Sequence, residues 1–89
     1  MEKRREHIWF SGQVQGVGFR FRAKHLANML GLTGWVKNDW DGRMEMQVQG
    51  TLPAIERLLV LLDELHFVEI TSVEREKIST ESELDFQIR

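Results

Sequence analysis

The chain passes from a strand-like to a helical pattern at Gly12-Gln13-Val14-Gln15-Gly16-Val17-Gly18-Phe19-Arg20. Before this stretch, Ile8 and Phe10 lie at alternate positions of a predicted strand over residues 7–14. After it, apolar residues recur at helical spacing up to Gly31, a typical helix stop; they are Phe19, Ala23, Leu26, Ala27 and Leu30. We therefore predict a strand, a glycine-rich connection and an amphipathic helix, in that order.

The remainder of the chain predicts a hairpin, a second helix and two further strands. A strand over residues 35–38 leads to the turn signal Asp41-Gly42, and alternating apolar residues follow at Met44, Met46 and Val48. The second helix begins near Pro53, whose missing N–H is harmless in a first turn. Its apolar stripe consists of Ile55, Leu58, Leu59, Leu62 and Leu65. A strand around Val73 and a final one over residues 85–89, with Phe86 and Ile88 inward, complete the chain.

The resulting order is β-α-β-β-α-β plus a short terminal strand. This order is typical of the α+β, ferredoxin-like sandwich, in which two helices cover one face of an antiparallel sheet. With 89 residues, the chain has room for a single domain over residues 1–89. The fold by itself does not specify a function, because the same architecture is found in enzymes, regulatory domains and RNA-binding proteins.

Composition excludes several kinds of chemistry. The chain contains no cysteine, which excludes disulfides, zinc–thiolate sites and thiol nucleophiles. A net charge of -2 gives no general attraction to nucleic acid or to an anionic membrane. No apolar segment approaches the length of a membrane span or follows the basic N-terminus as in a signal peptide. We therefore expect a cytoplasmic, monomeric protein that binds neither membrane nor nucleic acid.

The glycine-rich connection has the chemistry of an anion site. Backbone N–H groups at a helix start are unpaired and carry the positive end of the helix dipole. Gly16 and Gly18 allow a concave loop, and the guanidinium of Arg20 can bind two phosphate oxygens. Neither a Walker loop nor a dinucleotide fingerprint matches, because Phe19 and Phe21 stand where those motifs need other residues. From these residues alone, a tight turn with Arg20 in solvent is slightly favoured over an anion site.

Two separate motifs resemble the acylphosphatase family. The first is the Gly12–Arg20 stretch quoted above, which closely resembles the family's signature. The second is Leu30-Gly31-Leu32-Thr33-Gly34-Trp35-Val36-Lys37-Asn38 followed by Asp41-Gly42. The resemblance is strong from Gly12 to Gly50 and weaker in the rest of the chain.

The resemblance implies an enzyme that hydrolyses the carboxyl–phosphate anhydride of small acyl phosphates, such as acetyl or carbamoyl phosphate. It implies no metal, no cofactor and no phosphoenzyme. Arg20 becomes the phosphate-binding guanidinium, and Asn38 becomes the residue that orients the attacking water. The phosphate cradle is implied to be formed by Gln15, Gly16, Val17, Gly18, Phe19 and Arg20.

Two departures from the family pattern bear on the site. Gln13 replaces a usual basic residue, which we expect to alter surface charge only. Asp39 follows Asn38 where threonine is frequent, and its carboxylate is expected to weaken phosphate binding or rotate Asn38.

Other features lead to alternative interpretations. Trp9 and Trp35 are expected on the uncovered sheet face, where aromatics can stack RNA bases, although the acidic balance argues against RNA. A regulatory module that binds a small anion is a third reading. We expect the three histidines to lie too far apart to bind a metal. We also expect a solvated acidic loop, formed by Glu81, Glu83 and Asp85.

Overall fold

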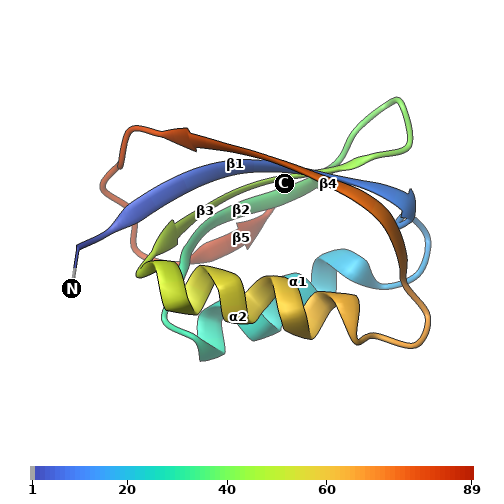
Figure 1. Ribbon diagram of the computed structural model, residues 1–89, viewed down its shortest axis with the longest axis horizontal. Helices are drawn as coiled ribbons and strands as arrows, with labels where there is room; N and C mark the ends of the chain where they lie inside the picture. The colour runs from blue at the N-terminus through green and yellow to red at the C-terminus, as the bar shows by residue number, and fades with distance from the viewer. Residues whose placement is uncertain (1) are drawn as a thin grey trace.

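The elements of the chain follow the predicted order (Figure 1). A computed structural model describes residues 2–89. The elements are β1 (Arg4–Gln13), α1 (Phe19–Met29), β2 (Thr33–Asn38), β3 (Met44–Gly50), α2 (Leu52–Asp63), β4 (Glu69–Ile78) and β5 (Phe86–Ile88). The α+β, ferredoxin-like arrangement is thus confirmed. The strand predicted around Val73 extends over ten residues, and β1 begins three residues before its predicted start at His7.

The five strands form one sheet in the order β4-β1-β3-β2-β5. Neighbouring pairs among β4, β1, β3 and β2 are antiparallel, as predicted, whereas β5 runs parallel to β2, so that the sheet is mixed. The direction of β5 has a simple cause. The strand β4 ends at the same end of the sheet at which β2 begins, and the connection crosses that end before β5 starts (Figure 1).

The core lies between the sheet and its two helices, which cover the same face (Figure 1). Strand alternation directs Ile8, Phe10, Met44, Met46 and Val48 into this core, where all five are buried. The helices contribute fully or almost fully buried residues at helical spacing, namely Phe19, Ala23 and Ala27 from α1 and Ile55, Leu58 and Leu62 from α2. The predicted apolar stripes are therefore correct at their centres. Their margins, Leu26, Leu30, Leu59 and Leu65, are only partly buried.

The opposite face of the sheet is polar and carries an ion cluster. The guanidinium of Arg5 is buried there, and it contacts Glu83 and Glu81 from the connection between β4 and β5. Gln49 holds the same connection, because its amide donates to the backbone oxygen of Glu81 (2.8 Å) and accepts from its backbone nitrogen (2.8 Å). The expectation of a solvated acidic loop is wrong for Glu83, whose side chain is only 18% exposed and pairs with Arg5. Glu81 also pairs with Arg5, but its side chain stays 58% exposed, as expected.

The tryptophans of this face are less available than expected. Trp35 exposes only 7% of its surface, with the guanidinium of Arg89 4.8 Å from its ring centroid. Trp9 is half-buried and stacks on His7 at 3.9 Å between ring centroids. An RNA-binding sheet needs open aromatic faces, so this placement argues against the RNA-binding interpretation.

A buried carboxylate joins the sheet to α2. Glu6 lies on the helix-facing side of β1 and accepts hydrogen bonds from Arg75 (2.7 and 2.9 Å) and Arg4 (2.8 Å). Arg75 also donates to Glu56 of α2 (2.7 Å). Burial acts to raise the pKa of Glu6, but the hydrogen bonds and charges of Arg75 and Arg4 outweigh it and hold the pKa below its ordinary value.

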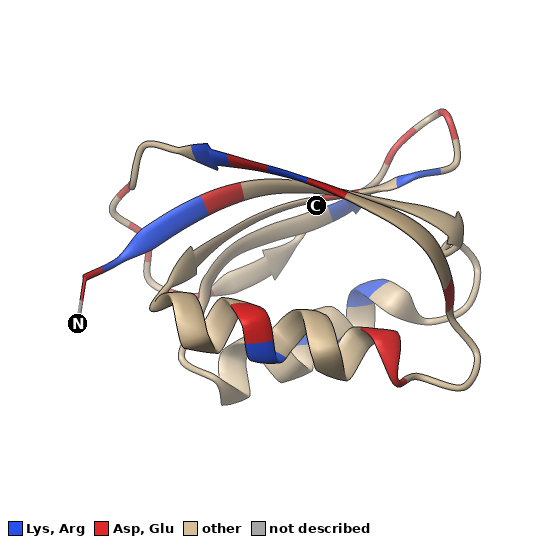
Figure 2. Cartoon of the chain, in the orientation of Figure 1, with Lys and Arg blue, Asp and Glu red and all other residues tan. Residues whose placement is uncertain are grey.

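The strand β4 forms one edge of the sheet and pairs only with β1 among the described residues. Its register places Arg75 and Lys77 on the helix side, opposite Ile8 and Glu6. Glu74 and Glu76 point to the other side. Figure 2 shows the resulting alternation of acidic and basic residues along the strand.

The core assignment predicts unequal effects for two adjacent leucines. Leu58→Ala should lower the free energy of unfolding by about 2–5 kcal/mol, because it opens a cavity among buried side chains. Leu59→Ala should cost clearly less, since Leu59 is only partly buried. Urea denaturation followed by circular dichroism measures both, and equal losses would contradict the placement of α2.

The Glu6 cluster predicts a pH-dependent contribution to stability. Glu6→Gln should cost about 1–3 kcal/mol at neutral pH, because it weakens charge-assisted hydrogen bonds. The pKa of Glu6 is lower in the folded than in the unfolded protein. The extra free energy of unfolding of the wild type over Glu6→Gln is therefore complete above the unfolded-state pKa of about 4.3. It is lost as the pH falls through the folded-state pKa. Thermal unfolding at pH 7 and pH 3 measures this change. Exposed Glu64→Gln is the control, and a difference that does not vary with pH would refute the account.

Candidate phosphate-binding and catalytic site

The connection between β1 and α1 forms a loop with two left-handed glycines. Gly16 has φ 72° and Gly18 has φ 79°, both in the region that side chains other than glycine rarely adopt. Among the described residues, a Cβ added at Gly16 would meet no atom within 4 Å, and one added at Gly18 would meet only the Phe67 ring at 3.8 Å. The backbone conformation, and not a lack of space, therefore requires glycine at these two positions.

The N-terminus of α1 is open to an anion. Gly18 is its N-cap and supplies no side-chain hydrogen bond, and the first turn contains no acidic residue. The first N–H groups of a helix have no partner within it, so those at the start of α1 face the loop with the positive end of the dipole. The buried ring of Phe19 packs 5.1 Å from that of Phe10, between centroids, and fixes the helix start to the sheet.

Arg20 stands in the first turn of α1, directly after this anchor, and is partly exposed. Among residues 2–89 no acidic side chain forms an ion pair with it, which leaves its guanidinium available to a ligand. Val17, between the two glycines, is half-buried and packs against the core. The sequence-predicted residues from Gln15 to Arg20 thus lie in one continuous loop and helix start.

The side chain of Gln15 joins this loop to the hairpin between β2 and β3. Its Nε2 donates to the backbone oxygen of Asp39 at 2.7 Å and to that of Arg43 at 3.0 Å. One amide therefore bridges the two ends of the hairpin turn and holds them against the loop.

Asn38, the last residue of β2, lies directly before this bridge. It pairs with Met44 of β3, and paired residues of antiparallel strands point to the same face. Because Met44 is buried in the core, Asn38 lies on the helix side of the sheet, on the face that α1 covers, and it is exposed. The structure thus places both signature segments at one end of the molecule, linked through Gln15.

Asp39 occupies a different environment from Asn38. Its carboxylate lies 4.0 Å from the guanidinium of Arg43 and close to Glu45, which in turn contacts His7 at 2.7 Å. Burial raises the pKa of Asp39, and the neighbouring carboxyls of Glu45 and Asp41 raise it further. The carboxyl after Asn38 therefore turns toward the polar sheet face and is neutralised more readily than an ordinary aspartate.

A tight turn fixes the tip of the hairpin. The nitrogen of Asp39 donates to the oxygen of Arg43 (2.8 Å), and the nitrogen of Gly42 donates to the oxygen of Asp39 (3.2 Å). Gly42 has φ 93°, as expected for the glycine that closes a three-residue hairpin loop. Asp41 accepts hydrogen bonds from both the backbone and the side chain of Arg43 (3.0 and 2.9 Å).

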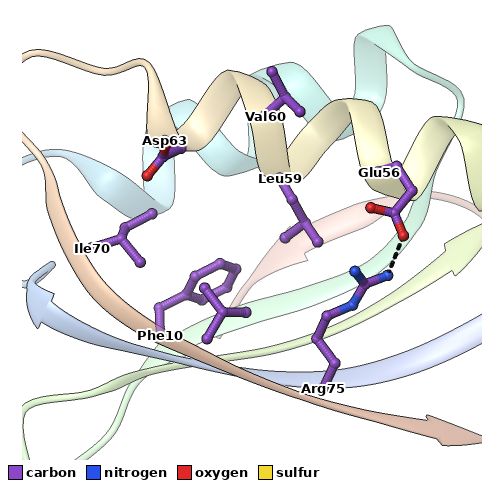
Figure 3. Close-up of a pocket in the computed structure, with 8 residues that line it drawn as sticks. Phe10, Glu56, Leu59, Val60, Asp63, Ile70 and Arg75 are labelled. Carbon is purple, nitrogen blue, oxygen red and sulfur yellow. Dashed lines mark hydrogen bonds and ion pairs between the residues drawn. The ribbon is translucent and has the colours of Figure 1, made fainter.

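An apolar groove of about 310 Å³ lies elsewhere, between α2 and β4 (Figure 3). Phe10, Leu59 and Ile70 point into it, and the ion pair of Arg75 with Glu56 borders it. None of its lining residues belongs to the glycine loop or to the hairpin. The groove is therefore separate from the candidate site.

Neither a side-chain cluster that could hold a metal nor a helix that could cross a membrane is found in residues 2–89. No three histidine or carboxylate side chains gather there as a metal-binding group. No helix in this part is both long and apolar enough to cross a membrane.

The family model named Acylphosphatase matches residues 6–88. The chain belongs to the acylphosphatase family. A curated acylphosphatase from Geobacillus kaustophilus is 50% identical over 56 residues, which cover 63% of this chain and 60% of that protein. The chain spans about three fifths of the length of the first curated relatives that it matches.

Solved acylphosphatases share the fold over nearly their whole length. The structure of an acylphosphatase from Coxiella burnetii superimposes with a TM-score of 0.90 at 36% identity and covers 98% of this chain and 93% of its own. The enzyme from Bacillus subtilis gives a TM-score of 0.91 at 32% identity, with 97% and 98% covered. The acylphosphatase fold therefore extends through the second half of the chain, where the sequence resemblance is weak.

Sequence reasoning assigned Gln15 to the phosphate cradle but missed the role of its side chain. The loop and the hairpin are far apart in sequence, and no local pattern predicts that an amide will bridge them. The one available signal is the residue type, since a glutamine amide can donate two hydrogen bonds from a single nitrogen.

The bridge predicts that loss of the Gln15 amide loosens the candidate site. Gln15→Ala removes two hydrogen bonds, each worth about 1 kcal/mol, and should speed amide hydrogen exchange at Asp39 and Gly42. Gln13→Ala is the matched control, because Gln13 is exposed in β1. Exchange measured by NMR that is equally slow in both variants would show that the bridge does not hold the turn.

Proposed function

We propose that the chain is an acylphosphatase that hydrolyses small acyl phosphates to a carboxylate and inorganic phosphate, as one domain over residues 1–89. The observation that carries this proposal is the connection of the glycine loop to the Asn38 hairpin through Gln15. This connection brings the glycine loop and the Asn38 hairpin together at one end of a fold that belongs to this family, which supports the proposal.

Phosphate binding rests on the loop and on Arg20. Among residues 2–89, the backbone N–H groups from Gln15 to Phe19 donate to no carbonyl of a turn or loop, and together with the helix dipole they favour a dianionic phosphate. The guanidinium of Arg20 adds two parallel, charge-assisted hydrogen bonds to its oxygens. The backbone donors are held by the loop and the helix start before the substrate binds, so they can stabilise the charge on the equatorial oxygens in the transition state without reorganisation.

The reaction then requires a positioned water molecule. The water oxygen bonds to phosphorus, the bond from phosphorus to the bridging oxygen breaks, and the carboxylate leaves with the electron pair. Asn38 orients the water but cannot remove its proton, because an amide is not a base near neutral pH. The proton passes to a phosphate oxygen. A carboxylate is a good leaving group, so positioning and charge stabilisation supply most of the acceleration.

No step of this scheme uses a metal or a cofactor. The substrate is a small acyl phosphate, and a nucleic acid or membrane partner plays no part. A cytoplasmic location and a monomeric state stay predictions from the sequence.

Two substitutions separate binding from turnover. Arg20→Gln should weaken competitive inhibition by inorganic phosphate at least about tenfold and lower kcat by about 10²–10³-fold. Asn38→Ala should lower kcat by about 10²–10³-fold while inhibition by phosphate stays unchanged. The assay is hydrolysis of benzoyl phosphate in EDTA, with a phosphomonoester to test selectivity for the anhydride.

Arg22→Gln is the matched control for Arg20, because its guanidinium lies over the Phe67 ring, 5.7 Å from the centroid. A folded wild-type protein that binds phosphate without hydrolysing benzoyl phosphate would instead support the anion-binding module. Hydrolysis that EDTA abolishes would overturn the metal-independent scheme.

A further inference from the structure

Trp40 is an unusually exposed tryptophan. It exposes 98% of its surface, whereas Trp35 exposes 7%. The other aromatic rings of the open sheet face and of the loop region lie near a cation: Arg43 at Trp9, Arg89 at Trp35 and Arg22 at Phe67. Within residues 2–89, no such cation lies over Trp40. Both faces of its indole are therefore available to a ligand.

The position of Trp40 is fixed relative to the phosphate loop. It directly follows Asp39, whose carbonyl oxygen lies 2.7 Å from Gln15 Nε2. Standard peptide dimensions therefore put the Cα of Trp40 within about 6 Å of that amide. The hydrogen bonds of the turn restrain the backbone on both sides of Trp40. The indole consequently projects from a hydrogen-bonded turn beside the Gln15 bridge.

The neighbours of Trp40 indicate which group it can bind. Asp41 is paired with Arg43 at 2.9 Å, and Asp39 turns toward Glu45 and Arg43. Arg43 and Glu45 contact the carboxyl groups of Asp39 and Asp41 on either side of Trp40. The side chain of Trp40 is therefore an apolar aromatic surface that projects from the turn. Such a surface gains from contact with apolar groups, and most from contact with another ring.

We propose that Trp40 contacts the acyl group of the substrate, and that the chain prefers acyl phosphates with an apolar, above all an aromatic, acyl group. This inference rests on the proposed function. The cradle binds the phosphate, which all acyl phosphates share, so discrimination between them requires contacts beyond the bridging oxygen. Trp40 is the large apolar side chain beside Asn38 that is free to make them.

The experiment compares two substrates and their stable analogues. The ratio of kcat/KM for benzoyl phosphate to that for acetyl phosphate is measured in the wild type, Trp40→Ala, Trp40→Phe and Met29→Ala. Met29 is an exposed apolar residue at the far end of α1 and serves as the control. Dissociation constants for benzoylphosphonate and acetylphosphonate are measured by calorimetry in the same proteins, because binding can be measured without turnover.

We expect Trp40→Ala to reduce both benzoyl-to-acetyl ratios by about 3- to 10-fold, mainly through KM, as loss of one aromatic contact implies. Trp40→Phe should retain most of the preference, and Met29→Ala all of it. Affinity for inorganic phosphate should not change in any variant. Ratios that stay equal in Trp40→Ala and the wild type would overturn the inference even if both substrates are hydrolysed.

Failure of the proposed function gives a different result. In that case neither substrate is hydrolysed by the wild type, while the phosphonate dissociation constants still report whether Trp40 contacts the acyl group. A Trp40→Ala variant with a normal circular dichroism spectrum and an unchanged phosphonate ratio would then refute the contact directly.

Discussion

The candidate site depends on two hydrogen bonds from one side chain. The amide of Gln15 links the phosphate loop to both ends of the hairpin turn that follows Asn38. The loop is otherwise held at β1, at Val17 against the core and at the buried ring of Phe19. The proposed mechanism requires that the glycine loop and Asn38 keep a fixed separation, because small displacements of the reacting groups cost rate. The bridge meets this requirement with a neutral group, which adds no charge beside a phosphate.

Charge is distributed so that the cradle stays positive in a chain with a net charge of -2. Carboxylates near the site are bound elsewhere: Asp41 by Arg43, Glu45 by His7, and Asp39 on the polar sheet face. On the other side of the sheet, Glu6 is neutralised by Arg75 and Arg4. The first turn of α1 contains no acidic residue, so the helix dipole and Arg20 act on the loop without a competing anion.

Local patterns predicted the elements whose residues alternate or repeat clearly. The junction at Gly16 and Gly18, the turn at Gly42 and the buried stripe of α2 all follow from short-range chemistry. Local patterns did not predict the parallel direction of β5 or the ion pair of Glu83 with Arg5. Both arise from chain segments that meet only in the folded state. Trp35 was correctly placed on the open face, yet its burial depends on Arg89 at the other end of the chain. The hydrogen bonds of Gln15 to the hairpin could not be predicted for the same reason, because they join segments far apart in the sequence.

The edge strand β4 carries one sign of charge on each side of the sheet. Two copies of the chain could pair their β4 edges as antiparallel strands related by a twofold axis. The helices of both copies then lie on the same side of the joined sheet. A helix-side residue of one β4 therefore lies opposite a helix-side residue of the other. If the pairing is centred on Glu74, Arg75 or Glu76, that residue lies opposite the same residue of the other copy. Like charges then face each other across the two strands, which is destabilising. The alternating charges thus disfavour self-pairing of this ten-residue edge strand in these three registers.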